Sequence, residues 1–383
     1  AMVLSGMAWD YEYANCVWSH VETKVAELQE KAYSLCNKKF NLASKIDVLK
    51  VTSALRKANK DEEPKVFLDV IQKWKKLRFI KSRILSPLLL LSGERIHSKV
   101  YTYTATGRVC IIEPNLQTIP RDIEIDDDVI SIRSAFIAKP GFVLIAADFC
   151  QLELRILAHL SQDKNLITNL TCPGDVFIAI AADWNNIAQD EVTDDLRQQT
   201  KQLCYGIIYG MGPKSLAQEL EITEIEAKEM SRKFMEIYAG IEIYAKKCVE
   251  ECRTNGFVMT LMCRKRFLPE INSAIQRNKV QAERQAVNTT IQGSAADIAK
   301  IAMVKIEKAL STFSQREITI TPSCTAHMVL QLHDELIYEV NEDIYKEVCR
   351  IIRKEMEGCV KLSIPLPVKI KTGTSWGQLK AEL

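Results

Sequence analysis

The segment FVLIAADFCQLELRILAHL, residues 142–160, joins an apolar run of strand length to a helical pattern. The run over 142–149 predicts a buried β-strand because it is short and continuously apolar. Asp148 stands near the end of this run, where burying a carboxylate is costly unless it is paired or bound to a metal. A turn-forming Asp is the alternative interpretation. The segment therefore predicts a strand followed by a helix, with one unusual acid at their junction.

A second acidic site of this kind lies in MVLQLHDELIYEV, residues 328–340. Its apolar, β-rich flanks predict a hairpin with His333 and Asp334 at the tip. Asp334 and Glu335 are then acids on an apolar hairpin, and the turn-forming alternative applies to them as well. Spacing along the chain does not show whether Asp148 and Asp334 meet.

The segment DDLRQQTKQLCYGIIYGMG, residues 194–212, predicts a helix with one stripe of cations and aromatics. The stripe consists of Arg197, Lys201, Tyr205 and Tyr209. A spacing of four drifts by roughly 40° per step, so these residues slant across one face. Acids in the first turn and glycines after the last turn indicate the helix ends. Two interpretations stay open: a solvated basic turn followed by a buried aromatic turn, or a clamp for the phosphates and base of a nucleotide.

The acids and the stripe would form a recognisable site if the fold brings them together. Two carboxylates offer the hard oxygen ligands that suit Mg²⁺, which accepts a few carboxylates plus substrate phosphate. With Arg197 and Lys201 nearby, such a pair predicts a two-metal phosphoryl-transfer site.

The composition is that of an ordinary globular chain of 383 residues, 47% hydrophobic and 26% charged. With 51 basic and 49 acidic residues the net charge is +2, so any nucleic-acid binding must come from local patches. Twelve cysteines show neither a CxxC pair nor zinc spacing, which favours reduced thiols in an intracellular protein. No signal peptide and no apolar run near the roughly 18 residues of a membrane span are present.

The remaining chain is mostly helical in pattern. Helices are predicted over 17–36, 224–253 and 279–310, the last with a small-residue patch at Gly293 where a backbone or ligand could approach closely. A charge-dense stretch over 53–83 mixes cations with aromatics and is either a solvated face or a phosphate track. The predicted fold class is α+β: a small sheet carrying the two acidic strands, surrounded by long helices.

These motifs resemble those of the A-family DNA polymerases. AADFCQLELRILAHLSQD resembles the first acidic motif of that family, LRQQTKQLCYGIIYGMG its fingers helix and LQLHDELIYEV its second acidic motif. TYTATGR with EPNLQTIP, and AERQAVNTTIQGSAADIAK, resemble its primer-template segments. The resemblance runs from about residue 17 to the end, with the motifs in family order. Within the family, DDLRQQTKQLCYGIIYGMG and TSWGQLK are most similar to the theta subfamily, with the nu subfamily second.

The resemblance implies a right-hand polymerase fold with an antiparallel palm sheet, helical fingers and a helical thumb. The thumb and an N-terminal remnant would span 1–99 and the fingers 164–285. The palm would be split between 100–163, with the first acidic motif, and 286–383, with the second.

The resemblance also implies the catalytic centre. Asp148, Asp334 and the carbonyl of Phe149 would bind two Mg²⁺ ions roughly 3.5–4 Å apart, for which Mn²⁺ is an expected substitute. Glu335 and Lys201 complete the implied catalytic set. Phe149-Cys150 stands where the family usually has Tyr-Ser, a change that is tolerable because the backbone and Asp148 do the metal binding.

Six residues are implied in nucleotide binding: Gln151, Glu153, Arg197, Lys201, Tyr205 and Tyr209. The two cations would neutralise the triphosphate, and the lysine would also protonate the leaving group. The first tyrosine would stack on the incoming nucleotide, and the second would pack near the template base. Glu153 would exclude the ribose 2′-hydroxyl, with the hydroxyl of Tyr205 as its hydrogen-bond partner. Phe177 stands where many bacterial members have a phosphate-contacting His.

Seven residues are implied in DNA binding: Arg108, Asn115, Gln117, Arg284, Asn288, Gln292 and His333. Arg108 and Gln292 would approach from the minor groove, where every correct base pair offers similarly placed acceptors. Asn115 and Gln117 would contact the template strand, and His333 would lie by the primer terminus.

The implied function is template-directed DNA synthesis without proofreading in this chain, in DNA repair by end joining or lesion bypass in the nucleus. Its partners would be a DNA primer-template and dNTPs, with no membrane, and a helicase domain elsewhere in the full-length protein stays open. A single-subunit RNA polymerase is one alternative, against which Glu153 argues. A catalytically inactive nucleic-acid-binding module is another, against which Asp148, Lys201 and Asp334 argue.

Overall fold

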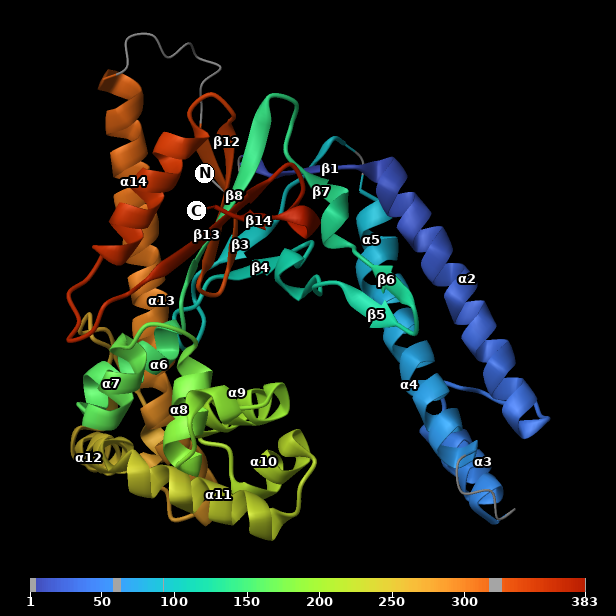
Figure 1. The fold of residues 1–383 in the computed structure, drawn as a ribbon, viewed down its shortest axis with the longest axis horizontal. Coiled ribbons are helices and arrows are strands. Elements are labelled where there is room, and N and C mark those ends of the chain that lie inside the picture. The colour runs from blue at the N-terminus through green and yellow to red at the C-terminus, as the bar shows by residue number, and fades with distance from the viewer. Residues whose placement is uncertain (1–4, 58–62, 92, 317–325, 383) are drawn as a thin grey trace.

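The computed structural model describes residues 5–57, 63–91, 93–316 and 326–382 (Figure 1). In this part of the chain the α-helices are α2 (Tyr11–Cys36), α3 (Lys45–Lys57), α4 (Glu63–Ile80), α5 (Ser86–Leu89), α6 (Leu152–Ser161), α7 (Lys164–Thr171), α8 (Val176–Asn185), α9 (Asp194–Ile208), α10 (Pro213–Leu220), α11 (Glu224–Ile237), α12 (Ala239–Asn255), α13 (Gln276–Arg316) and α14 (Tyr345–Glu357). The strands are β1 (Met7–Trp9), β2 (Arg95–Ile96), β3 (Lys99–Tyr101), β4 (Cys110–Ile112), β5 (Ile123–Ile125), β6 (Asp128–Ile130), β7 (Phe136–Ile137), β8 (Phe142–Phe149), β9 (Phe257–Met259), β10 (Lys265–Phe267), β11 (Ala326–Leu332), β12 (Glu335–Asn341), β13 (Val368–Gly373) and β14 (Lys380–Ala381).

The two acidic strands lie side by side in the largest sheet, whose order is β11-β12-β8-β13-β14. Every pairing in it is antiparallel. The strand predicted over 142–149 is β8, and the predicted hairpin is β11–β12 with His333 and Asp334 in its turn. The predicted α+β class is confirmed.

Strand β8 is apolar along its length because both of its faces are covered. Ile145, Ala147 and Phe149 belong to a core shared with helices α6, α9, α13 and α14. Leu144 and Ala146 point the other way, into a second core shared with α2 and α4. Side chains alternate between the faces of a strand, so Asp148 lies on the same face as Ala146, at the end where the strand leaves that core.

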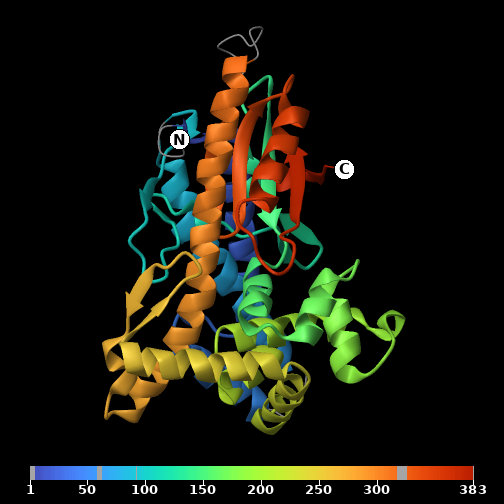
Figure 2. The same cartoon turned by 90° about the vertical axis from the view of Figure 1, so that its left-hand side faces the viewer.

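Helices α7 to α12 form a helical lobe below the sheet, and α13 runs from this lobe along the sheet (Figures 1 and 2). The helix predicted over 224–253 is two helices, α11 and α12. The chain leaves helical geometry at Tyr238, with φ −106° and ψ 52°. This break buries the Tyr238 ring completely and places its hydroxyl 2.9 Å from Asp183 Oδ2. The helix predicted over 279–310 is longer, since α13 spans Gln276–Arg316.

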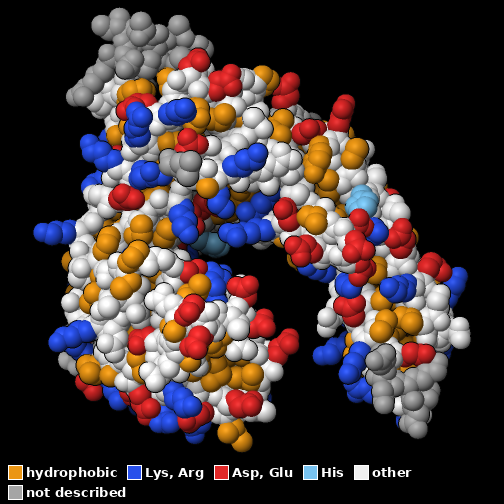
Figure 3. Space-filling view, viewed as in Figure 1, with side chains coloured by type: hydrophobic (Ala, Val, Ile, Leu, Met, Phe, Trp, Pro, Cys, Tyr) orange, Lys and Arg blue, Asp and Glu red, His pale blue; other side chains and the backbone are white. Residues whose placement is uncertain are grey.

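Helices α2 to α5 form a helical arm on the other side of the molecule (Figure 1). The helix predicted from residue 17 begins earlier, at Tyr11, because the Asp10 side chain accepts a hydrogen bond from the Tyr13 amide and caps it. Figure 3 shows an open channel between the arm and the helical lobe, with Lys and Arg side chains gathered at its inner end. Among the described helices, none is long and apolar enough to cross a membrane.

Candidate active site

The sheet brings the predicted carboxylates together. Glu335, the first residue of β12, lies opposite Asp148 of β8 in the antiparallel register. The Phe149 amide donates a hydrogen bond to the Asp334 carbonyl at 3.3 Å, which ties the hairpin turn to the end of β8. His333 adopts a left-handed φ of 55° in this turn. Asp148 and Asp334, which are far apart in the chain, thus lie at the same end of the inner strands of the sheet.

These carboxylates destabilise one another's charged forms. Burial raises the pKa of Asp334 to about 7, and the negative charges of Glu153 and Asp148 add to the effect, while Arg108 opposes it. Burial also raises the pKa of Asp148 and, together with the charge of Asp148, that of Glu335. In the described part of the chain, neither Asp148 nor Asp334 has a hydrogen-bonded or ion-paired partner for its carboxylate.

A divalent cation fits this pair. Crowded, partly buried carboxylates without a cationic partner are what a hard cation neutralises. Among the described residues, no group of three or more His, Cys, Asp or Glu side chains is arranged to hold a metal ion. The ligands that the resemblance implies are two carboxylates and a carbonyl, a set that suits Mg²⁺ sites completed by water and phosphate. Asp148, Asp334 and the carbonyl of Phe149 are the residues that would hold it.

A group of cations beside these acids was missed from the sequence. Lys369 of β13 lies opposite Asp148 in the register, on the side of β8 away from Glu335. Arg121, Lys371 and Lys369 all act to lower the pKa of Asp148, against the larger effect of burial. The sequence VKIKTG shows lysines at alternate positions, which is typical of a strand with one exposed face. It does not show which strand β13 pairs with.

Helix α9 carries the predicted stripe, and its two cations differ. The Arg197 guanidinium donates to Asp175 Oδ2 from Nε at 3.1 Å and from Nη2 at 2.7 Å. Asp175 is the N-cap of α8, where it accepts hydrogen bonds from the amides of Phe177 and Ile178. Lys201 is half-buried and has no hydrogen-bonded or ion-paired partner among the described residues. One cation is thus already oriented by the protein, and the other is unpaired.

The two tyrosines of the stripe stack on each other. Their ring centroids are 6.2 Å apart with an interplanar angle of 21°. The Phe177 ring packs on the Tyr205 ring, with the ring centroids 6.1 Å apart. Burial raises the pKa of Tyr205 to about 12, with smaller contributions from Tyr209, Glu153 and Asp334. The aromatic end of the stripe therefore lies close to the carboxylates of Glu153 and Asp334.

Glu153 is the centre of a buried polar group. It is 4% exposed, and its Oε1 pairs with Nη2 of Arg108, while Oε2 is buried without a partner. Among the described residues, no hydrogen bond joins the Tyr205 hydroxyl to Glu153, so that predicted bond is not formed in this structure. Burial raises the pKa of Tyr209 to about 12, and the negative charge of Glu153 adds to the effect. Both tyrosines therefore lie within electrostatic reach of this acid.

Arg155 does not face Glu153, although both lie on α6. It is 4% exposed and donates to three backbone carbonyls, those of Cys150, Leu170 and Pro365, at 2.9–3.1 Å. Gln151, which precedes α6, is held in a left-handed conformation with φ 48°. The turn that follows β8 is therefore held by the buried guanidinium of Arg155.

Three predicted DNA-binding residues lie every four residues along α13, and two of them contact the end of α9. Asn288 donates to the Tyr209 carbonyl at 3.0 Å, and its Oδ1 is buried without a partner. The side chain of Arg284 lies against Gly210, where an added Cβ would be 2.7 Å from its Cγ. Gln292 is one turn further along, half-buried. The C-terminal end of α9 is thus docked on this stripe.

Asn115 and Gln117, two other predicted DNA contacts, differ in their exposure and in their hydrogen-bond partners. Asn115 is exposed, and its side chain accepts from the Gln117 amide. The Gln117 side chain donates to the carbonyls of Val109 and Gln331 and accepts from the Ile111 amide. It therefore joins this loop to β11, and its template contact stays a prediction.

Comparisons with known proteins agree with this geometry. The model of the family described as DNA polymerase family A matches residues 12–378. DNA polymerase theta of Drosophila melanogaster is 44% identical over 97% of this chain, and that of Mus musculus is 40% identical over 81%. The chain spans 18% and 15% of the length of these two relatives. DNA polymerase I of Bacillus subtilis is 32% identical over 99% of the chain, which spans 44% of that protein.

The fold comparison covers nearly the whole chain. The Pol domain of Pol1 from M. smegmatis, in complex with DNA primer-template and dNTP, superposes with a TM-score of 0.86 and 30% sequence identity, covering 97% of this chain and 68% of that one. The chain therefore belongs to DNA polymerase family A, and its sheet, helical lobe and helical arm form the right-hand polymerase fold.

Proposed function

We propose that this chain is the catalytic domain of a template-directed DNA polymerase, which adds dNTPs to a primer 3′-hydroxyl by two-metal-ion phosphoryl transfer. The observation that carries the proposal is the convergence of α9 with the two acidic strands. The charge of Asp334 acts on Tyr205 and is itself affected by Asp148 and Glu153. Family membership and the similarity to a polymerase domain solved with primer-template and dNTP support the same conclusion.

The residues have separable roles in this reaction. Divalent cations, when held by Asp148, Asp334 and the Phe149 carbonyl, activate the primer hydroxyl and neutralise the triphosphate. Arg197 and Lys201, one turn apart on α9, donate to the phosphates, and charge placed where it develops in the transition state contributes most to rate. The lysine is also the group placed to return a proton to the leaving pyrophosphate.

The remaining site residues form the sugar and base pocket. Tyr205 presents its ring to the incoming nucleotide, while Tyr209, within electrostatic reach of Glu153, lies near the template base. Glu153, in the first turn of α6, closes the space beneath the sugar and rejects a 2′-hydroxyl. Gln151, in its left-handed turn, borders the same pocket.

The DNA would lie in the channel between the helical arm and the lobe. Arg108 and Gln292 approach the terminal pair from the minor groove, where a donor tests pair shape without reading sequence. Arg284, Asn288, Asn115 and His333 border the primer-template. In this assignment residues 1–99 are the thumb, 164–285 the fingers, and 100–163 with 286–383 the palm.

The finer assignment rests on the theta relatives. Their similarity supports a role in DNA repair, by end joining or lesion bypass, in the nucleus. The chain spans less than a fifth of the length of those relatives. The presence of a helicase domain must therefore be tested on the full-length protein.

Primer extension with purified protein, Mg²⁺ and all four dNTPs tests the proposal. We expect extension that follows the template base and that stops on chelation. DNA binding without any incorporation, with either Mg²⁺ or Mn²⁺, would instead identify an inactive nucleic-acid-binding module. Incorporation of rNTPs in preference to dNTPs would favour an RNA polymerase.

A further inference from the structure

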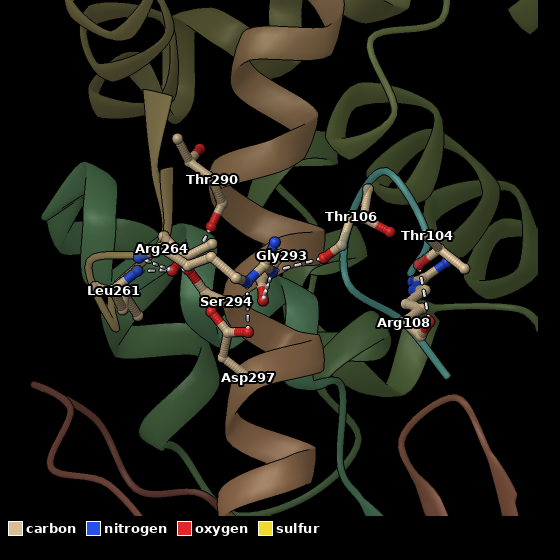
Figure 4. A network of polar contacts seen from close by, with 10 residues as sticks. Thr104, Thr106, Arg108, Leu261, Arg264, Thr290, Gly293, Ser294 and Asp297 are labelled. Atoms are coloured by element: carbon tan, nitrogen blue, oxygen red, sulfur yellow. Dashed lines mark hydrogen bonds and ion pairs between the residues drawn. The ribbon is translucent and has the colours of Figure 1, made fainter. Parts of the chain in front are cut away.

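A network around Arg264 joins three segments that are distant in the sequence (Figure 4). Arg264 follows the tight turn between β9 and β10, in which Cys263 has a φ of 59°. Its Nε donates to Asp297 Oδ1 of α13 at 2.9 Å. Its Nη2 donates to the Thr106 carbonyl at 2.7 Å and to the Gly293 carbonyl at 3.2 Å.

The two glycines that touch this guanidinium leave no room for a side chain. A Cβ on Gly107 would lie 2.6 Å from Nη2 of Arg264, and the φ of Gly107 is +81°. A Cβ on Gly293 would lie 2.7 Å from Thr260 Cγ2 and 3.2 Å from the same Nη2. The small-residue patch on α13 therefore receives the protein's own hairpin, so the approach of a ligand is not needed to explain it.

The segment that Arg264 holds leads directly to Arg108. Residues 102–109 join β3 to β4 without helix or strand of their own. Inside the segment, the Gly107 amide donates to the Thr104 carbonyl and the Thr104 hydroxyl donates to the Arg108 carbonyl. The hydrogen bond from Arg264 to the Thr106 carbonyl connects this turn to the hairpin that packs on α13. Arg108, in the same segment, forms an ion pair with the buried carboxylate of Glu153.

We propose that Arg264 is a positioning residue for Arg108: it fixes the loop so that the Arg108 guanidinium stays at the sugar and minor-groove end of the site. The proposal deepens the proposed function and rests on it. A planar guanidinium can satisfy an acid and two carbonyls at once, whereas a lysine ammonium is a single point donor on a flexible stem. Arg264→Lys should keep the ion pair with Asp297 and lose the hold on Thr106.

The chain offers a matched control on the same hairpin. Arg266, two residues on, donates from Nη1 to Thr289 Oγ1 of α13 at 2.6 Å. It too is partly buried against α13, but no hydrogen bond joins it to the loop over 102–109 among the described contacts. Arg266→Lys therefore reproduces the loss of a hairpin–helix bond without the loss of the loop tie.

The first test does not depend on activity. Amide hydrogen exchange of peptides covering 102–109 should speed up about tenfold or more in Arg264→Lys, because local opening becomes easier, and stay within about twofold of the original rate in Arg266→Lys. Equal acceleration in both variants, or none in Arg264→Lys, would overturn the positioning role. Asp297→Asn provides a second variant should Arg264→Lys fail to fold, with a smaller acceleration expected in the same peptides.

The second test uses extension of matched and mismatched primer termini. In Arg264→Lys the ratio of the two kcat/KM values should fall about tenfold, the scale of one good base-edge contact, and in Arg266→Lys it should not change. In an Arg108→Ala background, Arg264→Lys should add less than a twofold further change, because residues acting through one another are not additive. Additive losses would overturn the inference. A protein that extends no primer at all overturns the proposed function instead, while the exchange test still decides the role of Arg264.

Discussion

Glu335 and Asp148 occupy facing positions on neighbouring antiparallel strands, and the turn just before Glu335 carries Asp334. The Phe149 amide donates a hydrogen bond to the Asp334 carbonyl, which ties this turn to the end of β8, next to Asp148. A site that is built on strands and tied to them is held more precisely than one on free loops.

Asp334→Asn should reduce primer extension by on the order of a hundredfold or more, because a metal-ligand charge is lost where charge develops. Primer-template affinity should stay within a few-fold, since little DNA contact is removed. Single-turnover extension and DNA titration measure the two quantities. Asp343→Asn, an exposed acid just beyond β12, is the control and should extend normally. A mutant at residue 334 that retained a tenth of the original rate would contradict the two-metal assignment.

Lys201→Ala should lose on the order of a hundredfold in kcat/KM for dNTP, while the Kd for DNA changes little. Its charge is needed on the triphosphate during the step, and such terms appear in kcat/KM. Lys214→Ala, on the exposed start of α10, is the comparison variant and should change neither quantity. Comparable losses in DNA affinity and in kcat/KM for dNTP would mean that α9 binds DNA and not the nucleotide.

Sugar selection should depend on Tyr209 and Glu153 together. Glu153→Ala should bring the kcat/KM values for dNTP and rNTP closer together, with some loss for dNTP because the pocket is looser. Tyr209→Phe should shift the ratio in the same direction, because it removes a hydroxyl that lies within electrostatic reach of Glu153. Tyr205→Phe keeps its ring and should leave the ratio nearly unchanged. The measurement is single-nucleotide insertion opposite one template base, and the opposite order of the two tyrosine variants would show that Tyr205, and not Tyr209, acts together with Glu153.

Binding of primer-template should weaken steeply with salt although the net charge is only +2. On α4 and just after it, Lys73 and Lys81 pair with acids, while Lys75, Lys76 and Arg83 have no acidic partner among the described residues. Such free cations release counterions on binding, and six to ten phosphate contacts cost roughly 10³–10⁵ in affinity between about 50 and 200 mM salt. Fluorescence anisotropy over this range is the measurement. A flat curve would exclude an extended phosphate track.

Arg155→Met should destabilise the fold by about 3 kcal/mol, because three carbonyls around a buried guanidinium lose a charged donor. Urea unfolding monitored by tryptophan fluorescence reports the change. Arg350→Met, at a side chain 75% exposed, should stay within about 0.5 kcal/mol of the original stability. Equal stabilities of the two variants would show that Arg155 does not clamp the turn after β8.

Several elements could be predicted from the sequence because their signals are local. The continuous apolar run over 142–149 indicates a strand covered on both faces, as β8 is. The apolar, β-rich segments on either side of His333 and Asp334 indicate the hairpin over 328–340. The four-residue spacing on α9 is a property of one helix, so its stripe and both its ends were visible. The fold class and most candidate site residues follow from such stretches and from the family that they resemble.

Other features were decided by how the elements pack. Which strand lies against Asp148 depends on register, so Lys369 was not identifiable as its neighbour. How near each tyrosine lies to Glu153 depends on how α9 packs beside α6, which the sequence does not show. The break at Tyr238, whose ring is completely buried, was likewise not visible in the helical pattern over 224–253.

The hydrogen bond from Arg264 to the Thr106 carbonyl also depends on packing, because it joins residues 158 positions apart. Local sequence sets the conformational preference of a segment over about one to four turns. Contacts between distant segments are instead selected by the burial and hydrogen bonding of the whole core, and no single stretch contains that information.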